Sequence, residues 1–334
     1  MTDKPTILVT GGAGYIGSHA VLALVDGGWP VVVVDNLTTG FRWAVHEKAV
    51  FVEGNIGDVT FMEGVIAQHG VKGIMHFAGS IIVPESVENP LKYYSNNTAN
   101  SRALIEAAVR GGVSQFIFSS TAATYGIPKE SPVTEDSPKL PINPYGMSKL
   151  MTEIMLADVS AAHELNYCAL RYFNVAGADP HGRSGQSTAG ATHLIKVAVE
   201  AALGKRSHVS IFGTDYDTPD GTGVRDYIHV SDLAAAHVLA LEALIAQPEQ
   251  SLTMNCGYGS GFSVLDVLDA VDRVTNMSVE RRIEGRRAGD PPALISDNRR
   301  IKATLPWEPA YADLNTIVEH ALAWERKLSE RSTG

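Results

Sequence analysis

A glycine-rich turn near the start of the chain restricts the possible folds more than any other segment. Residues Thr6–Thr10 form a β-branched run without polar alternation, as expected for a strand that is buried on both faces of a parallel sheet. The segment Gly11–Gly17 follows directly. Residues 18–25 then have the character of a helix that ends at Gly27–Gly28, and Val31–Val34 is a second buried strand. This order of strand, turn, helix and strand predicts the first unit of an α/β protein with a parallel sheet.

The turn has the residue types that bind a dinucleotide. Glycines let backbone N–H groups approach a pyrophosphate at the positive end of a helix, and Gly17 lets that helix pack close to the strand. Asp35 follows the second strand, close to the expected distance of about 20 residues from the turn. A carboxylate there binds the ribose hydroxyls of adenosine and repels a 2′-phosphate. The segment therefore predicts NAD rather than NADP.

Strands and helices continue to alternate after this unit. The runs Val50–Glu53, Gly73–Phe77 and Gln115–Phe118 have the character of strands. Helices before Gly70 and over about Asn97–Arg110 occupy the intervals between them. This alternation predicts a Rossmann-type doubly wound parallel sheet, in which ligands bind at the carboxyl ends of the strands.

A tyrosine and a lysine follow one of these strands at helical spacing. Asn143 is a suitable N-cap for a helix, and Tyr145 and Lys149 lie four residues apart on one face of it. An ammonium group beside a phenol favours phenolate and lowers its pKa. Such a tyrosine can take a proton from a sugar hydroxyl while the cofactor takes hydride, and Thr121, at the end of the strand, can bridge by hydrogen bonding.

Charge and cysteine content exclude several classes of function. The formal net charge of −10 in 334 residues argues against nucleic acid as a partner, although a small anion needs only a few arginines. The two cysteines, Cys168 and Cys256, fit neither a disulfide framework nor a metal site. His229 lies near Asp226 and Asp232, but its run is typical of a strand, so no metal is expected. No segment has the length and apolarity of a membrane span, and no signal peptide is evident, which predicts a cytoplasmic protein.

Several segments resemble a known superfamily, and they occur in its order along nearly the whole chain. The extended short-chain dehydrogenases/reductases are matched by Thr10–Gly17, Phe77–Gly79, the Tyr145–Lys149 pair and Arg171–Asn174. The later segments Gly221–Val230 and Arg286–Asp290 resemble more narrowly the UDP-glucose (UDP-galactose) 4-epimerases. The narrower resemblance carries more information, because these later motifs are much more specific than a glycine turn.

The resemblance implies a reaction and a role for individual residues. Tyr145 would be the acid and base on the sugar 4-hydroxyl, Lys149 would bind the nicotinamide ribose and Thr121 would assist. Hydride would pass from C4 to NAD, and the resulting 4-keto sugar would turn over and accept hydride on its other face. The residues implied in NAD binding are Gly11, Gly14, Tyr15, Ile16, Gly17, Asp35, Asn36, Asn55, Ile56, Phe77, Ala78, Gly79, Asn96, Tyr145, Lys149 and Phe173.

The resemblance also implies a site for the UDP-sugar. Arg225 and Arg287 would bind the diphosphate, and Asp290 would bind the uridine ribose. Two arginines suit a diphosphate, because each guanidinium can form paired charged hydrogen bonds. The alternative is that Arg225 is only paired with its neighbour Asp226. The full set implied in substrate binding is Thr121, Asn174, Leu194, Phe212, Arg225, Arg287, Asp290 and Leu294.

The chain departs from the family pattern at five positions. Asn55 replaces a frequent Asp, Thr121 a frequent Ser, Ile81 a frequent Lys and His193 a frequent Asn. The lysine missing at Ile81 would remove one phosphate contact to NAD, and His193 is assigned no chemistry. Leu294 replaces a large Tyr at the sugar pocket of some members. Its smaller side chain leads to the hypothesis that N-acetylated UDP-hexoses enter the pocket.

Other functions have specific sequence requirements. A nucleotide-sugar 4,6-dehydratase would carry Asp-Glu where this chain has Ala122–Ala123, so elimination is disfavoured. Epimerases of UDP-N-acetylhexosamines, UDP-pentoses or UDP-uronates share the same C4 chemistry and remain open. A non-catalytic NAD-binding regulator is the remote alternative, and the presence of Thr121, Tyr145 and Lys149 disfavours it.

Two lobes are expected from the chain length and from the resemblance. Residues 1–175 would form the NAD-binding domain and residues 176–334 the UDP-sugar-binding domain, with a helix at about 231–245 packed back on the first domain. The polar loop 178–185 is a candidate mobile segment. A homodimer is expected, because relatives pair helices from the regions 97–110 and 145–162. Four apolar residues of the second region are instead assigned to the intramolecular core: Met151, Ile154, Met155 and Val159.

Overall fold

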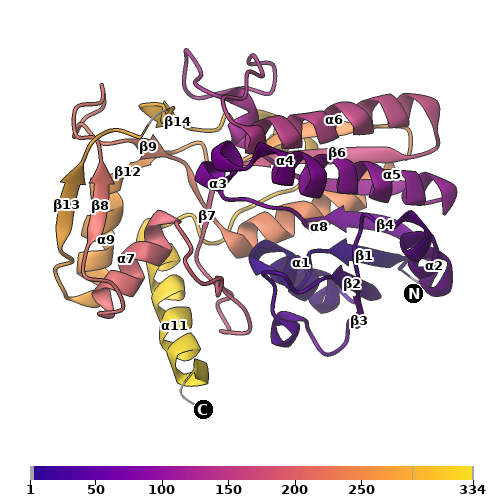
Figure 1. Cartoon of the computed structure of the whole chain (residues 1–334), viewed down its shortest axis with the longest axis horizontal. Helices are drawn as coiled ribbons and strands as arrows, with labels where there is room; N and C mark the ends of the chain where they lie inside the picture. The colour runs from indigo at the N-terminus through magenta and orange to yellow at the C-terminus, as the bar shows by residue number, and fades with distance from the viewer. Residues whose placement is uncertain (1–3, 288, 333–334) are drawn as a thin grey trace.

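A seven-stranded parallel sheet forms the centre of the computed structural model, which describes residues 4–287 and 289–332 (Figure 1). Its spatial order is β11-β6-β5-β4-β1-β2-β3, and every neighbouring pair runs parallel. The predicted Rossmann-type doubly wound sheet is thus confirmed. The strands are β1 (Thr6–Thr10), β2 (Val31–Asp35), β3 (Val50–Glu53), β4 (Val71–His76), β5 (Gln115–Thr121), β6 (Asn166–Tyr172) and β11 (Leu252–Cys256).

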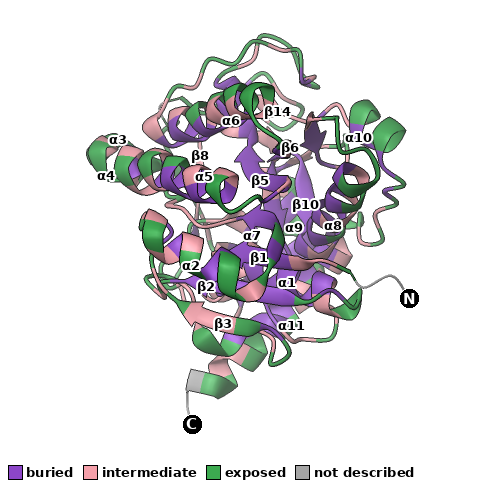
Figure 2. Ribbon diagram, turned by 90° about the vertical axis from the view of Figure 1, so that its right-hand side faces the viewer, coloured by how far each residue is buried: buried purple, intermediate pink, exposed green. Residues whose placement is uncertain are grey.

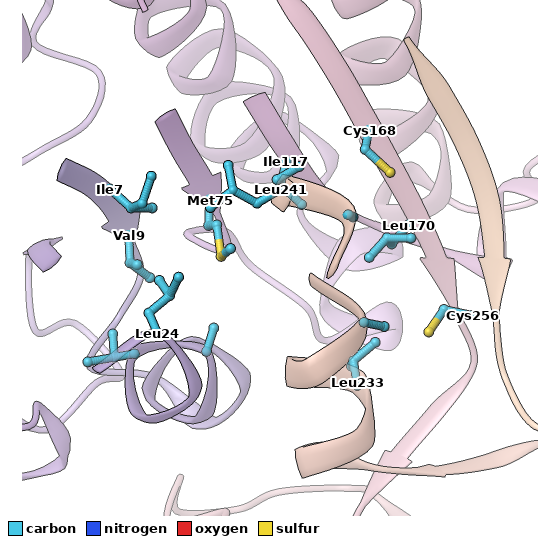
Figure 3. Packing of buried hydrophobic residues seen from close by; sticks show 14 of the residues in the cluster. Ile7, Val9, Leu24, Met75, Ile117, Cys168, Leu170, Leu233, Leu241 and Cys256 are labelled. Carbon is cyan, nitrogen blue, oxygen red and sulfur yellow. The ribbon is translucent and has the colours of Figure 1, made fainter. Parts of the chain in front are cut away.

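Helices cover both faces of this sheet, so the strands are largely buried (Figure 2). One face carries α1 (Tyr15–Asp26) and α8 (Val230–Ala246), and the other carries α2 (Val59–His69), α5 (Asn100–Arg110) and α6 (Pro144–Ala162). Alternate residues of a strand point to opposite faces. Accordingly, Ile7 and Val9 pack with Leu24 and Leu233 in one cluster (Figure 3), whereas Leu8 belongs to the cluster on the other face.

The glycine turn between β1 and α1 depends on two close backbone approaches. Gly11 has a φ of +71°, and a Cβ added to it would lie 2.5 Å from the Ala78 nitrogen. A Cβ added to Gly17 would lie 2.2 Å from the Gly11 carbonyl oxygen. Neither position has space for a side chain, so α1 can begin immediately beside the end of β1 only with glycine at both.

A second lobe lies beside the carboxyl ends of the strands and is seen on the left in Figure 1. Its helices α7 (Leu194–Ala202), α9 (Val264–Thr275) and α11 (Leu314–Ser332) share one hydrophobic cluster. Its short strands form three groups: β8 (Val209–Phe212) with β13 (Arg281–Glu284), β9 (Val224–Arg225) with β12 (Phe262–Ser263) and β14 (Ala293–Leu294), and β7 (Asn174–Ala176) with β10 (Tyr227–His229).

Shorter elements connect these parts. The segment before α5 is a π-helical turn, η2, rather than the start of the predicted helix at Asn97. The short elements are η1 (Arg42–Ala44), α3 (Val83–Glu88), α4 (Pro90–Tyr93), η2 (Tyr94–Ala99), η3 (Ala122–Tyr125) and α10 (Arg299–Thr304). Among the described residues, no helix combines the length and the apolarity needed to cross a bilayer.

The chain passes between the lobes more than once. Strand β11 extends the central sheet by pairing with β6, and helix α8 packs against α1, although both follow residue 176 in the chain. Helix α10 also packs beside β11. A boundary at residue 175 therefore marks only the first of several crossings, and the sheet of the first lobe is completed by late residues.

The loop 178–185, expected to be mobile, is tied to α1 in the structure. The Ser18 hydroxyl lies 2.7 Å from that of Ser184, and Arg183 pairs with Asp26 at 2.9 Å. The Tyr15 hydroxyl donates to the Gly177 carbonyl at 2.7 Å, directly before the loop. The loop is thus attached to α1 by hydroxyl and carboxylate partners that no local pattern indicates, and its mobility stays a prediction.

The assignment of four α6 residues to the core was half wrong. Met155 and Val159 pack against the cluster under the sheet, but Met151 and Ile154 have exposed fractions of 37% and 53%. Met151 is contacted by the Thr98 hydroxyl at 3.9 Å, so these outer positions of α6 are partly covered by η2 and are not part of the core.

Candidate active site

Tyr145, Lys149 and Thr121 meet at the carboxyl end of β5. Helix α6 begins where predicted, because the Asn143 side chain accepts a hydrogen bond from the Gly146 nitrogen at 2.8 Å. One turn later, the Lys149 Nζ donates to the Ser119 carbonyl at 3.0 Å. The Thr121 hydroxyl is hydrogen-bonded to Tyr145. All three predicted catalytic residues are buried and lie at one edge of the sheet.

Burial dominates the electrostatics of this group. Burial raises the pKa of Tyr145, and the hydrogen bond from Thr121 lowers it by a smaller amount. Burial also lowers the pKa of Lys149 to about 8. The expectation that the lysine would lower the pKa of the tyrosine was therefore wrong for the protein alone. The free energy that a phenolate loses by leaving water is larger here than the free energy that it gains from the Thr121 hydrogen bond.

The amino terminus of α1 fits the pyrophosphate of a dinucleotide. Gly14 is its N-cap, and no side chain caps this end, so the first amides of the helix are directed away from any protein acceptor. Asp35 ends β2 beside the turn, where its carboxylate accepts from the Ala13 nitrogen at 3.0 Å and from the Leu37 nitrogen at 2.8 Å. Glycine at 11 and 17 leaves the approach clear. The residues present therefore fit NAD.

The segment Phe77–Gly79 passes between the glycine turn and Lys149. The Phe77 nitrogen donates to the Thr10 carbonyl at 3.0 Å, which brings the end of β4 beside the end of β1. A Cβ added to Gly79 would lie 3.8 Å from the Lys149 Nζ. The segment thus contacts the glycine turn at one end and approaches Lys149 at the other.

The remaining predicted NAD residues surround the same edge of the sheet. Asn55 follows β3 and accepts from the Gly57 nitrogen at 2.9 Å, and Ile56 beside it is buried. Asn36 follows Asp35 and accepts from the Thr38 nitrogen at 3.1 Å. Asn96 donates to the Ser80 hydroxyl at 2.9 Å, just past Gly79. The structure thus brings the set together at the ends of β1 to β4.

The predicted diphosphate and uridine residues form a second group in the other lobe. Arg225 on β9 lies 3.6 Å from the Asp290 carboxylate, and the Arg287 guanidinium lies 3.7 Å from the centre of the Phe212 ring. Leu294 stands opposite Arg225 in the β14–β9 register. The two arginines, Asp290 and Phe212 are therefore held close together, as the substrate hypothesis requires.

The alternative of a pair between Arg225 and Asp226 does not occur. The Asp226 carboxylate is buried and accepts from the Tyr258 and Gly259 nitrogens at 3.0 Å each, and from the Ser296 hydroxyl at 2.6 Å. The side chain of Arg225 faces the opposite direction, toward Asp290. In the protein alone, Arg225 is therefore paired with Asp290 and not with its neighbour Asp226.

Asn174 and Leu194 line a small, partly open pocket between β7, α7 and α11. His193 is the N-cap residue of α7, and its Nδ1 is 2.7 Å from the Gln186 Nε2. Burial lowers the pKa of His193, so the ring is neutral near pH 7. These contacts give it a structural partner and agree with its assignment to no chemistry.

A small apolar cluster follows the carboxyl ends of β5 and β6. Ala122, Tyr125, Val133 and Phe173 pack together, and Leu294 is partly buried against them. Ala122 occupies the first position at which a dehydratase would carry an acid. Ala122 and Ala123 themselves carry no acidic group, which is the sequence argument against elimination.

His229 does not converge with Asp226 and Asp232 into a metal site. The His229 Nε2 lies 3.0 Å from the His320 Nδ1, and Asp232 accepts from the Ala310 and Tyr311 nitrogens. No group of three or more metal-binding side chains occurs in residues 4–287 and 289–332.

Sequence reasoning missed residues that support the site without belonging to a motif. Asn97 accepts from the Ser80 nitrogen at 2.7 Å and donates to the Ser148 hydroxyl at 3.0 Å, so it links the segment after β4 to α6. Ser119 supplies the carbonyl that fixes Lys149. The sequence signal for Asn97 was its position directly after Asn96, which had been assigned to NAD binding.

Comparison with known proteins gives the family. Residues 7–257 match the family described as "NAD dependent epimerase/dehydratase family". The chain belongs to this family. Over its whole length it is 56% identical to the UDP-glucose 4-epimerase of Azospirillum brasilense and covers 97% of that protein. The predicted superfamily and the predicted class of NAD-dependent epimerase are confirmed.

Solved structures agree in fold over almost the whole chain. The UDP-glucose 4-epimerase from Brucella ovis in complex with NAD superposes with a TM-score of 0.92 at 44% identity, covering 96% of this chain and 98% of that one. The UDP-Glc/GlcNAc 4-epimerase of Campylobacter jejuni gives a TM-score of 0.85 at 46% identity, covering 97% and 99%. NAD as the cofactor is confirmed by the family and by the NAD-bound neighbour.

The buried lysine gives a testable pH dependence of stability. Burial lowers the pKa of Lys149 from 10.5 to about 8, so between these values the unfolded chain binds a proton that the folded chain has released. The free energy of unfolding therefore rises with pH in this window. In urea unfolding without nucleotide, we expect the parent to gain about 2 kcal/mol over Lys149→Met from pH 7 to pH 9.5.

The control for this measurement is Lys72→Met, which removes an exposed lysine from β4. It should leave the pH dependence of the parent unchanged. A difference between the parent and Lys149→Met that stays constant with pH would contradict the buried, destabilised ammonium.

Proposed function

We propose that the chain inverts the configuration at C4 of a UDP-hexose, interconverting UDP-glucose and UDP-galactose with NAD held in the first lobe. The observation that carries this proposal is the Thr121–Tyr145–Lys149 group at the end of β5, together with the pair of arginines in the second lobe. Relatives with up to 56% identity over the full length bear the name UDP-glucose 4-epimerase, and the prediction of UDP-hexose 4-epimerisation is confirmed at that level.

Tyr145 acts as both acid and base on the sugar 4-hydroxyl. Bound NAD supplies the hydride acceptor for C4 and the hydride donor for the return step. To take the proton of the 4-hydroxyl as hydride leaves C4, Tyr145 must be ionised at that step, and it returns the same proton when hydride comes back. Burial raises its pKa and opposes ionisation, whereas the Thr121 hydrogen bond favours the ionised form. Lys149, one helical turn away, carries a proton at neutral pH, because its lowered pKa of about 8 still lies above 7. Proton transfer at one oxygen in both directions makes the reaction reversible.

The arginines of the second lobe bind the UDP half of the substrate. Arg225 and Arg287 offer two guanidinium groups to the diphosphate, and Asp290 accepts from the ribose hydroxyls. Asn174 and Leu194 lie beside the amino terminus of α7, which has no side-chain cap and adds partial positive charge. Binding through the nucleotide leaves the sugar free to present either face to Tyr145.

The activity test compares the parent with Tyr145→Phe. The parent should convert UDP-galactose to UDP-glucose, and denaturation of the purified protein should release NAD. Loss of the phenol hydroxyl should lower kcat by about 10²- to 10⁴-fold, because general acid–base catalysis contributes that much, while NAD remains bound.

The matched control is Tyr167→Phe at the amino end of β6, away from the carboxyl end of β5 where Tyr145 and Thr121 meet. It removes the same atom and should retain parental kcat. An NAD-loaded parent that epimerises none of UDP-galactose, UDP-N-acetylgalactosamine and UDP-xylose would show the proposed function to be wrong. Retained kcat in Tyr145→Phe would remove that residue from the mechanism.

Leu294 sets the width of the sugar pocket in this proposal. It lies at the edge of the apolar cluster formed by Ala122, Tyr125 and Phe173, where a larger ring would project toward the sugar. The relative from Campylobacter jejuni, which acts by its name on UDP-Glc and UDP-GlcNAc, supports room for an N-acetyl group in this fold. Pentose and uronate substrates share the UDP contacts and are compared in the same assay.

Substitution at Leu294 tests this assignment. We expect Leu294→Tyr to lose turnover of UDP-N-acetylgalactosamine by at least about tenfold while keeping that of UDP-galactose, because an added ring fills the pocket. Leu294→Met conserves volume and should keep both activities. Equal effects of the tyrosine on both substrates, or no N-acetyl turnover in the parent, would refute the assignment.

A homodimer that pairs α5 and α6 with a second copy accounts for the exposed apolar residues of α6. Met151 and Ile154 are exposed beside a shallow apolar depression lined by Tyr94, Thr98, Ala99, Arg102, Met151 and Met155. Ile154→Glu would place a charge in this contact, so sedimentation should change from the mass of two chains to that of one. A parent that sediments as one chain would contradict the dimer.

The cytoplasm is the proposed location of the enzyme. Cys168 and Cys256 are both free and buried, which suits a reducing compartment. The partners expected in this setting are the UDP-sugar and a second copy of the chain.

A further inference from the structure

Three consecutive residues of β5 are bonded to three successive turns of α6. Thr121 bonds to Tyr145, and the Ser119 carbonyl accepts from Lys149. The residue between them, Ser120, donates its hydroxyl to Glu153. Tyr145, Lys149 and Glu153 follow one another at intervals of four residues, so they lie on one face of the helix. The first two bonds belong to the reacting group, and the third has no role in the mechanism described above.

Glu153 is held by a buried ion pair. Its carboxylate accepts from Arg171 on β6 through two nitrogens, Nε at 2.9 Å and Nη2 at 2.6 Å. The side chains are only 7% and 5% exposed. Arg171 stands opposite Ser120 in the β5–β6 register, so both partners of the carboxylate come from neighbouring strands at the same level. A paired, planar contact of this kind fixes distance and orientation together.

The same arginine connects the catalytic helix to the sugar-pocket wall. Its Nη1 donates to the Tyr125 hydroxyl at 3.0 Å, and that hydroxyl donates to the Asn255 side chain at 2.7 Å. Asn255 donates to the Val133 carbonyl at 2.9 Å, and the Val133 nitrogen donates to the Ile295 carbonyl at 2.8 Å, next to Leu294. Every link of this chain is a directional hydrogen bond between buried groups.

Stability alone does not account for the pair. Replacing a buried ion pair by apolar residues of similar size is often neutral or stabilising, because two charges must lose their hydration. Removing only one partner is costly, because a charge is then left buried. Unlike an apolar contact, a paired ionic contact fixes the register between the two elements that carry it.

We propose that Glu153 and Arg171 are positioning residues for epimerisation. Their pair holds α6 in register with the end of β5, which sets the contact between Thr121 and Tyr145, and holds the wall at Leu294 at a fixed distance from it. Neither residue touches the reacting atoms. The proposal rests on the proposed role of Tyr145 as the acid and base.

A double substitution separates positioning from stability. Glu153→Met combined with Arg171→Met removes both charges and keeps the volume, so the thermal unfolding temperature should stay near that of the parent. We expect kcat for UDP-galactose to fall about 10²-fold, the cost of a misplaced reacting group. KM should change less than threefold, because the UDP contacts lie in the other lobe, and the pH profile of kcat should shift.

Two further variants complete the test. Arg171→Lys keeps the charge but not the paired geometry, and we expect an intermediate loss of kcat. Ile66→Ala makes a cavity in α2, where Ile66 is 2% exposed. It should lower the unfolding temperature by an amount typical of core truncation and leave kcat and the pH profile unchanged.

The outcomes distinguish this inference from the proposed function. An inactive parent that retains NAD would contradict the proposed function itself. An active parent together with a folded double variant of parental kcat and pH profile would overturn the positioning role. Loss of kcat that only follows the loss of folded protein, in the double variant and in Arg171→Lys, would also overturn it and assign the pair to stability.

Discussion

The close approach of two backbone segments at Gly11 and Gly17 is the constraint on which the rest of the structure depends. With no side chain at either position, α1 starts beside the last residue of β1 and directs its amino terminus along the edge of the sheet. The end of β4 then passes directly over the turn, held by the bond from Phe77 to Thr10. The end of β4 therefore lies beside the end of β1, where the strand order of the sheet reverses. The segment that follows β4 approaches Lys149 at Gly79. A larger residue at either position would separate cofactor site from catalytic helix.

Burial favours the uncharged form of both Tyr145 and Lys149. It raises the pKa of Tyr145 and lowers that of Lys149, so the folded protein alone disfavours the charges that its chemistry uses. The opposing contributions come from fixed dipoles and hydrogen bonds, such as the Thr121 hydroxyl and the Ser119 carbonyl. The protonation states of Tyr145 and Lys149 therefore depend on burial and hydrogen bonding together, which is typical of groups that exchange protons near neutral pH.

Local patterns were sufficient where one segment determines its own structure. The strand at Thr6–Thr10, the acid at Asp35 and the N-cap at Asn143 depend on residues a few positions away, and each was predicted from the sequence. The direction of the Tyr145 pKa was not, because burial is a property of the assembled fold. The attachment of the loop 178–185 to α1 also required knowledge of which surface the loop meets.

Long-range features gave no comparable signal. Residues 252–256 carry nothing that identifies them as the seventh strand of the sheet, because parallel pairing with β6 joins segments about 80 residues apart. The ion pair of Glu153 and Arg171 was missed for a similar reason. A charged residue two turns along a helix has the same appearance in a sequence whether it faces water or a buried partner. By contrast, the residues proposed for the UDP site were found only through a family resemblance, and the structure pairs Arg225 with Asp290 and Arg287 with Phe212.

The late position of β11 has a consequence for how the chain is made. Ribosomes release a polypeptide from its amino end, and a domain folds when the last segment of its core has emerged. Here β6 remains an open edge of the sheet until β11 and α8 have been synthesised, so the nascent first lobe exposes an unpaired strand and an uncovered apolar face during this interval. The order of elements along the chain thus makes the nucleotide-binding lobe dependent on residues that are translated after part of the substrate lobe.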